Sequence, residues 1–335
     1  MKSNAKLYIL CPAYFASGGP ELLHQLHYSL NKKGLSSFIY YIDKAENDHA
    51  YTNERFKKYI EPEQIADFIE DVEENYLIIP EIYITTVNYT RINMLFWWLS
   101  VDNFLLSNGY RIENITKNNI KGTIKVFLNM SPYNMLKNAI NKPNVLFHLY
   151  QSEYARLFLK KLGFKNTLCL SDYINEEAIY VGDSVTKKDI IVYNPKKGIE
   201  TVQFLKANSP ENFEWIPIEN MTPKEISALL VRAKIYIDFG NHPGKDRIPR
   251  EAVLNNCCII TNQIGAAKNK VDIPISSIYK FNDPILNLKD FIDLVTNIFE
   301  NFELHCKNFV QYKMIIQDER AKFIKDIDVL IKIIS

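Results

Sequence analysis

Twice along this chain a short apolar strand leads through a glycine-containing turn into a helix, and this pattern restricts the fold more than any other feature. In the first half, a continuous apolar strand at residues 7–11 is followed by Gly18 and Gly19, a helix at 21–32 and a strand at 36–42. Continuous apolar runs are typical of parallel strands buried on both faces. Strands that alternate with helices predict a doubly wound α/β sheet.

The second half repeats the pattern. A strand at 189–193 leads through a turn ending at Gly198 into a helix, and a strand at 234–239 ends in a turn that contains Gly240 and Gly244. The fold class that we expect is therefore α/β, with two doubly wound Rossmann-like domains facing a cleft.

The remaining elements follow from apolar periodicity, proline and glycine positions and cap residues. Ser152 and Thr222 are expected to cap helices, the latter in a capping box with Glu225. Further strands are predicted at 76–79, 82–87, 94–99, 124–129, 144–148, 167–170, 213–218 and 257–261, and further helices at 63–73, 152–162, 199–207, 222–232, 251–255, 288–302 and 308–334.

Length and charge limit the domain count and the class of partner. A chain of 335 residues exceeds what one hydrophobic core normally spans, and the polar segment 171–188 resembles a linker. We expect domains at 1–175 and 176–307, with a C-terminal helix at 308–335. The net charge of +1 provides no global field that would attract nucleic acid.

The five cysteines show no CxxC spacing, which predicts free thiols in a reducing compartment. The apolar run after Lys6 imitates a signal peptide, but it contains Pro12 and leads directly into a helix, so we interpret it as a strand. A cytoplasmic protein follows. Peripheral contact with the inner face of a membrane stays open.

Candidate site residues lie where the predicted strands end, because open α/β sheets bind ligands there. In the first half, Gly18 and Gly19 would let the backbone approach a ligand, although a tight turn needs them equally. Asp102 and His148 follow strands and are the candidates for a group that assists an acceptor. A histidine at a strand end is also commonly structural.

The second half carries basic turns that could neutralise a diphosphate, with Arg suited to bidentate phosphate contacts. Solvated loop charges are the alternative. Glu251 could accept hydrogen bonds from sugar hydroxyls, and His242 and Asp246 lie in the same turn. The candidate donor-binding residues are Gly18, Gly19, Lys196, Lys197, Gly198, Lys245, Arg247, Arg250, Glu251 and Gly265.

The chain resembles the GT-B glycosyltransferases of glycosyltransferase family 4 over nearly its whole length. Ser17-Gly-Gly-Pro-Glu21 is similar to the family's first glycine turn, Lys196-Lys-Gly198 to the end of its phosphate motif, and Glu251-Ala252 to the second glutamate of its Glu, seven residues, Glu motif. Residues 221–240 resemble the segment leading into the donor site, and Gly265-Ala-Ala267 the small-residue turn that follows.

This resemblance implies that 1–175 is the acceptor-side domain, that 176–307 is the nucleotide-sugar donor domain and that the C-terminal helix packs back on the first domain. It implies transfer of a sugar from a nucleotide-sugar donor to a glycan or lipid-linked glycan in surface polysaccharide synthesis, with retaining chemistry. Glu251 would hold the donor ribose, and the basic groups the diphosphate.

Two departures set this chain apart from the family pattern. Pro243 stands where the first glutamate is expected, so His242 or Asp246 would have to substitute for it. The arginine of the phosphate motif is absent, and Asn194 stands near its place. His242-Pro243 also resembles the His-Pro motif of bacterial sialyltransferases, which keeps a CMP-sugar transferase, or a transferase of another phosphate-linked group, as an alternative.

Neither a metal nor another cofactor is expected. Asp326 and Asp328 have DxD spacing but lie in a predicted helix, and Cys257 and Cys258 would point to opposite faces of a strand. A non-catalytic nucleotide-sugar or glycan-binding module is the alternative from another class.

Overall fold

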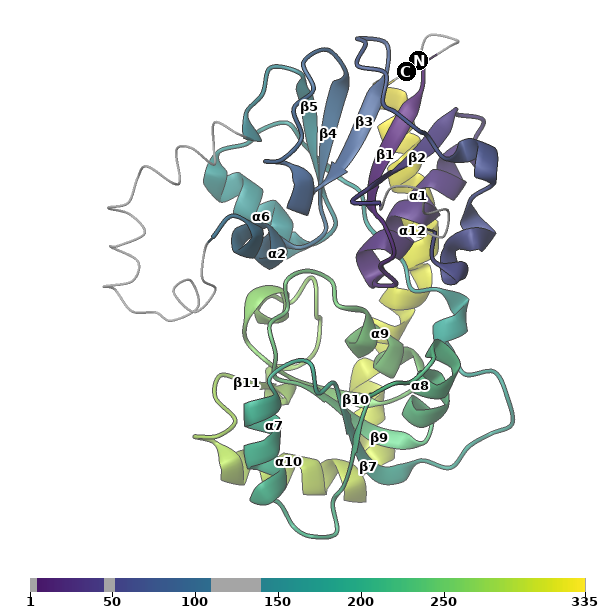
Figure 1. The fold of residues 1–335 in the computed structure, drawn as a ribbon. Coiled ribbons are helices and arrows are strands. Elements are labelled where there is room, and N and C mark those ends of the chain that lie inside the picture. The colour runs from purple at the N-terminus through teal and green to yellow at the C-terminus, as the bar shows by residue number, and fades with distance from the viewer. Residues whose placement is uncertain (1–4, 45–51, 110–139, 335) are drawn as a thin grey trace. The chain divides into compact units, whose positions relative to one another are not determined.

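The computed structural model describes residues 5–44, 52–109 and 140–334, which divide into two compact units (Figure 1). Unit 1 comprises Met1–Asp172 and Ala321–Ser335, and unit 2 comprises Tyr173–Arg320. Each unit contains one parallel sheet and its own hydrophobic core. This is the α/β architecture of two doubly wound sheets that the alternating pattern predicted.

The sheet of unit 1 has six strands in the order β2-β1-β3-β4-β5-β6. Its most buried strands are also its most continuously apolar ones, as expected for a parallel sheet covered on both faces. The strands are β1 (Leu7–Pro12), β2 (Ser37–Ile42), β3 (Tyr76–Pro80), β4 (Asn93–Trp98), β5 (Val145–Tyr150) and β6 (Thr167–Cys169).

Three helices of unit 1 contain the candidate site residues or follow the strands that carry them. Helix α1 (Gly18–Lys32) begins at the glycine pair, α2 (Val101–Ser107) follows β4, and α6 (Glu153–Leu162) follows β5. Ser152 caps α6 by accepting a hydrogen bond from the backbone N–H of Ala155, as predicted. Gly163 ends that helix with φ of 82°.

The sheet of unit 2 has five strands in the order β11-β10-β9-β7-β8. Thr222 and Glu225 form the predicted capping box at the start of α8. The strands are β7 (Lys188–Tyr193), β8 (Glu214–Pro217), β9 (Ala233–Asp238), β10 (Cys258–Asn262) and β11 (Lys280–Phe281), and the helices are α7 (Ile199–Ala207), α8 (Pro223–Leu230), α9 (Arg247–Leu254), α10 (Leu288–Glu300) and α11 (Phe302–Cys306).

The last helix, α12 (Val310–Ile334), contributes to both units. Its residues up to Arg320 belong to unit 2, and those from Ala321 onward belong to unit 1. In unit 1, its Asp326 accepts a hydrogen bond from the backbone N–H of Ser171 at 2.9 Å. Across the described ranges, no helix combines the length and the apolar character that crossing a bilayer requires.

Two predicted elements are wrong. Residues 63–73 do not form a helix, because this segment pairs with its neighbours instead: Ala66 donates its backbone N–H to Ile39 at 2.8 Å, and the Asp71 carboxylate accepts the backbone N–H of Ile92 at 2.8 Å. Residues 82–87 are not a strand. Residues 82 and 83 belong to the 3-10 turn η3 (Glu81–Tyr83), and residues 84–86 continue as a turn. The Glu81 carboxylate accepts the backbone N–H of Leu99.

Other differences concern elements that the pattern did not reveal. Helix α2 and the two-residue strand β11 are too short for periodicity to show them. Helix α9 begins at Arg247, earlier than the predicted start at residue 251. The predicted strand at 124–129 lies outside the described residues.

Candidate functional site

Three turns of unit 2 lie at one edge of its sheet. They follow β7, β9 and β10, which are neighbouring parallel strands, so their carboxyl ends meet there. The turns cover residues 194–198, 239–246 and 263–264. Most of the donor-binding residues predicted in the second half lie in or beside these turns.

Glycines hold the three turns in contact. A Cβ on Gly198, whose φ is 59°, would lie 2.7 Å from the carbonyl carbon of Phe239. A Cβ on Gly240 would lie 2.4 Å from Cβ of Lys197, and one on Gly265 would lie 2.2 Å from the carbonyl oxygen of His242. Real Cβ atoms do not approach backbone so closely, so larger residues would separate the turns. The predicted sites Gly198 and Gly265 thus have a packing role in the structure.

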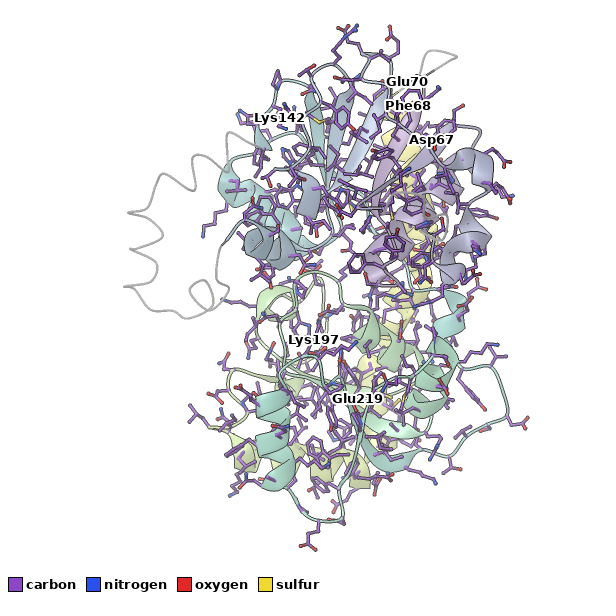
Figure 2. The ribbon with its side chains drawn as sticks, viewed as in Figure 1. Asp67, Phe68, Glu70, Lys142, Lys197 and Glu219 are labelled. Atoms are coloured by element: carbon purple, nitrogen blue, oxygen red, sulfur yellow. The ribbon has the colours of Figure 1, made fainter. Side chains whose placement is uncertain are left out.

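Lys197 joins the first turn to the second (labelled in Figure 2). Its ammonium lies 2.9 Å from the Asp246 carboxylate and donates a hydrogen bond to the backbone carbonyl of Asn241 at 3.1 Å. The side chain keeps 26% of its surface exposed, so a ligand can reach it. Lys196, its neighbour, is exposed.

His242 is fully buried in the second turn, between two carboxylates. Its Nδ1 lies 2.9 Å from Oδ2 of Asp246, an ion-pair contact without the alignment of a good hydrogen bond, and its Nε2 lies 3.8 Å from Oδ1 of Asp238. Burial opposes the charged imidazolium, but the two carboxylates outweigh it and raise the pKa of His242. Burial also acts to raise the pKa of Asp246, and the contacts with His242 and Lys197 reverse this and lower it.

Asp238 belongs to this cluster although the sequence analysis did not select it. The carboxylate accepts the backbone N–H of Gly240 at 3.1 Å and the hydroxyl of Tyr236 at 3.2 Å. The signal that could have found it is a charged residue at the end of an otherwise apolar strand, directly before the turn.

Lys245 and Arg250 both pair with Glu319 on α12, at 2.8 and 2.7 Å. Arg250 is 1% exposed and also donates to the backbone carbonyls of Lys245 and Asp246. These contacts make Arg250 a structural tie between α9 and α12 rather than a group that faces solvent. Glu319 was missed because it lies far away in the sequence, on a helix with no motif.

Arg247 and Glu251 lie one turn apart on α9. Nε of Arg247 is 3.6 Å from the Glu251 carboxylate, and both side chains keep part of their surface exposed. They therefore remain accessible on the first turns of α9, the helix whose N-cap residue is Asp246.

In unit 1, the predicted residues Gly18, Gly19 and Asp102 each lie at a helix start. Gly18 and Gly19 form the first turn of α1, and a Cβ on Gly19 would meet Leu99 at an ordinary 3.8 Å. Asp102 is buried in the first turn of α2 and accepts the hydroxyl hydrogen bond of Tyr154 at 2.8 Å.

His148 does not follow a strand, as the sequence analysis had it, but lies within β5. Its Nδ1 accepts the indole N–H of Trp98 at 3.1 Å, and its ring packs against Phe96 and Phe164. Burial lowers the pKa of His148 to about 4, so the ring is neutral at pH 7. The apolar strand continues through His148 because Trp98 satisfies its polar atom inside the core.

Asp238, His242 and Asp246 are close enough to be considered as metal ligands, since one donor atom from each lies within 4.8 Å of the others. The Asp246 carboxylate already has a positive partner, because the Lys197 ammonium contacts it directly, and the Asp238 carboxylate accepts hydrogen bonds from Tyr236 and Gly240. We therefore interpret the cluster as an internal ion network and assign no metal to it.

No protein-family model matches the chain, and no curated protein sequence does. Solved structures do match it. Sucrose-phosphate synthase from Thermosynechococcus elongatus has a TM-score of 0.65 with 10% identity, over 98% of both chains. HepE (Alr3699) of Anabaena, solved in complex with UDP-glucose, has a TM-score of 0.62 with 9% identity, over 98% of this chain and 99% of that one. The chain has the GT-B fold.

A third GT-B match is WaaG, a glycosyltransferase involved in lipopolysaccharide biosynthesis, with a TM-score of 0.58, 9% identity and coverage of 95% of this chain and 98% of that one. Identities this low establish the common architecture and no more. In these three matches the likeness covers 95% to 98% of this chain, so it extends into both units.

Proposed function

We propose that this protein is a glycosyltransferase that moves a sugar from a nucleotide-sugar donor to a glycan or glycolipid acceptor in surface polysaccharide synthesis. Unit 2 would hold the donor and unit 1 the acceptor. The observation that carries the proposal is the set of three interlocked turns at the carboxyl edge of the unit 2 sheet, with the accessible ammonium of Lys197 among them. The GT-B match that was solved with UDP-glucose supports a donor of this class.

The chemistry required of these residues is mainly electrostatic. As the anomeric carbon separates from the nucleoside diphosphate, negative charge develops on the leaving phosphate. Lys197, Arg247 and the N-terminus of α9 would stabilise that charge, and Glu251 would accept hydrogen bonds from the donor ribose. We propose metal-independent, retaining transfer, in keeping with the family resemblance.

A screen of thermal stability against UDP-, GDP-, dTDP- and CMP-sugars tests the donor class. Stabilisation that grows with the concentration of one nucleotide class identifies the donor, because a ligand that binds only the folded state stabilises it. Stabilisation by CMP-sugars alone would favour the transferase alternative suggested by His242-Pro243. No response to any nucleotide sugar would contradict the proposal.

Lys197→Ala tests whether the proposed phosphate contact matters for turnover. We expect a loss of donor turnover of about 100-fold, which is the size seen when one charge-stabilising group is removed from a transition state. Lys188→Ala is the matched control, since this exposed lysine lies at the amino end of β7, away from the turn. Equal turnover in both variants would remove Lys197 from the mechanism. Donor binding without donor hydrolysis or transfer in the unaltered protein would favour the binding-module alternative.

A further inference from the structure

Four ionisable groups form a continuous chain at the turn after β9. Lys197 contacts one oxygen of Asp246, the other oxygen of Asp246 contacts Nδ1 of His242, and Nε2 of His242 faces Asp238. Asp238 is fixed from behind by the Tyr236 hydroxyl and the Gly240 backbone N–H. The chain thus connects an accessible lysine to a fully buried histidine.

The surroundings of His242 leave the imidazole no other charged contact among the described residues. Asp238 faces it from β9, Asp246 from its own turn, and Lys197 from the turn after β7. Beyond the turn after β10, Ala266 donates its backbone N–H to the His242 carbonyl at 2.8 Å, which is a contact with the backbone and not with the ring. A neutral ring would leave the buried carboxylate of Asp238 and the partly exposed carboxylate of Asp246 to share the single charge of Lys197, which is a costly arrangement where water is largely excluded.

We propose that His242 acts as a protonated positioning residue of the donor site, with Asp238 and Asp246 holding its charge in place. This inference rests on the proposed function of unit 2. In the free protein Asp246 is shared between Lys197 and His242. When a diphosphate draws Lys197 toward itself, the imidazolium stays behind as the counter-ion of Asp246, so no buried carboxylate is left unpaired.

The protonation of His242 also changes the net charge of the site that would bind a diphosphate. Among the ion-paired groups around the turn, the cations Lys197, Lys245, Arg247 and Arg250 are matched in number by the carboxylates Asp238, Asp246, Glu251 and Glu319. These eight groups carry no net charge, so the set together with His242 is positive only while His242 is protonated. Donor affinity is highest while the imidazole is charged, and it decreases as the pH rises through the pKa of His242 in the folded protein.

The experiment combines histidine-ring NMR of the free protein with UDP binding by calorimetry, both from pH 5.5 to 9. In the unaltered protein, the ring that His242→Gln removes from the spectrum is expected to titrate with a midpoint above the ordinary pKa of a histidine, about 6.5. The UDP affinity should decrease above that midpoint by up to ~10-fold per pH unit, as linkage to one proton requires. Asp238→Asn should shift both midpoints to lower pH together. His242→Gln should remove the decrease of UDP affinity above pH 7, where the terminal phosphate of UDP, with a second pKa near about 6, is already ionised.

His305→Gln is the control, because His305 belongs to unit 2 but contacts Tyr279, which directly precedes β11. It should leave both midpoints unchanged, and circular dichroism establishes that each variant is folded. A midpoint for His242 at or below the ordinary histidine pKa of about 6.5, or tight UDP binding that does not weaken as the pH rises, would overturn the inference and leave the proposed function intact. Absence of UDP binding at every pH, with no other nucleotide replacing it, would instead contradict the proposed function and the donor-linked role with it.

Discussion

At the scale of single residues, the site depends on glycines because a side chain at their positions would clash with a neighbouring turn. Gly265 combines a left-handed φ of 56° with a hypothetical Cβ only 2.2 Å from the carbonyl oxygen of His242. Sequence motifs alone suggest a glycine that lets a ligand approach. The structure supplies a second reason, since the neighbouring turn occupies the space where a side chain would be.

Gly265→Ala is therefore expected to destabilise the protein and to displace His242. The backbone conformation alone costs ~1–2 kcal/mol for a residue with a Cβ, and the contact with His242 adds to that. Gly163→Ala is the matched control, because Gly163 has φ of 82° but nothing within 4 Å of its Cβ position. Urea denaturation of both variants gives the two losses in the free energy of unfolding. The loss in Gly163→Ala reports the backbone strain alone, and any additional loss in Gly265→Ala reports the contact with His242. Equal losses of the free energy of unfolding would show that the crowding at Gly265 relaxes without cost.

At the scale of elements, the tie between α9 and α12 is the feature that the sequence could not reveal. Glu319 on α12 receives both Lys245 and Arg250, and all three side chains are largely buried. Two predicted phosphate ligands are thereby held by a carboxylate of their own unit. The start of α9 keeps Arg247 and Glu251 accessible instead.

Glu319→Gln should lower the free energy of unfolding by ~3–5 kcal/mol, the usual loss when one partner of a buried ion pair is removed. Glu176→Gln is the control. It breaks an ion pair of Glu176 with Arg320, in which both side chains are exposed, and such pairs contribute ~0–1 kcal/mol. Chemical denaturation of the two variants gives the comparison. A loss for Glu319→Gln no larger than that of the control would mean that Arg250 and Lys245 find other partners.

At the scale of the whole molecule, the described residues of unit 1 include three buried histidines that are held neutral. Burial lowers the pKa of His24, His27 and His148 to about 4 in each case. In an unfolded chain they titrate near 6.5. Their contribution to stability is therefore fully present above pH 6.5 and is lost as the pH falls from there toward 4.

We expect unit 1 to lose protection against hydrogen exchange between pH 7 and pH 5, after correction for the intrinsic exchange rate. Each of the three histidines should contribute ~2 kcal/mol to this loss, from 1.36 kcal/mol per unit of pKa difference. His27→Gln provides the check, because it removes one titrating ring and should reduce the pH dependence by about one third. Protection of β1 and α1 that is unchanged at pH 5 would contradict the prediction.

The sequence by itself determined the alternation of strands and helices, the capped starts of α6 and α8, and the turns that gather at the carboxyl edge of the unit 2 sheet. These features depend on local physics: apolar periodicity, the conformational freedom of glycine and the side-chain caps of helix termini. The same information placed Lys197, His242 and Asp246 in or beside those turns, because each follows a strand by only a few residues.

Only the tertiary structure determined which charged side chains form ion pairs with one another. Asp238 became part of the cluster because β9 ends beside its own turn, and Glu319 because α12 packs against α9. His148 proved to be a core residue because Trp98, fifty positions away, satisfies its ring nitrogen. Ion pairs and buried hydrogen bonds depend on distances between segments that are remote in the chain, and no local pattern encodes those distances.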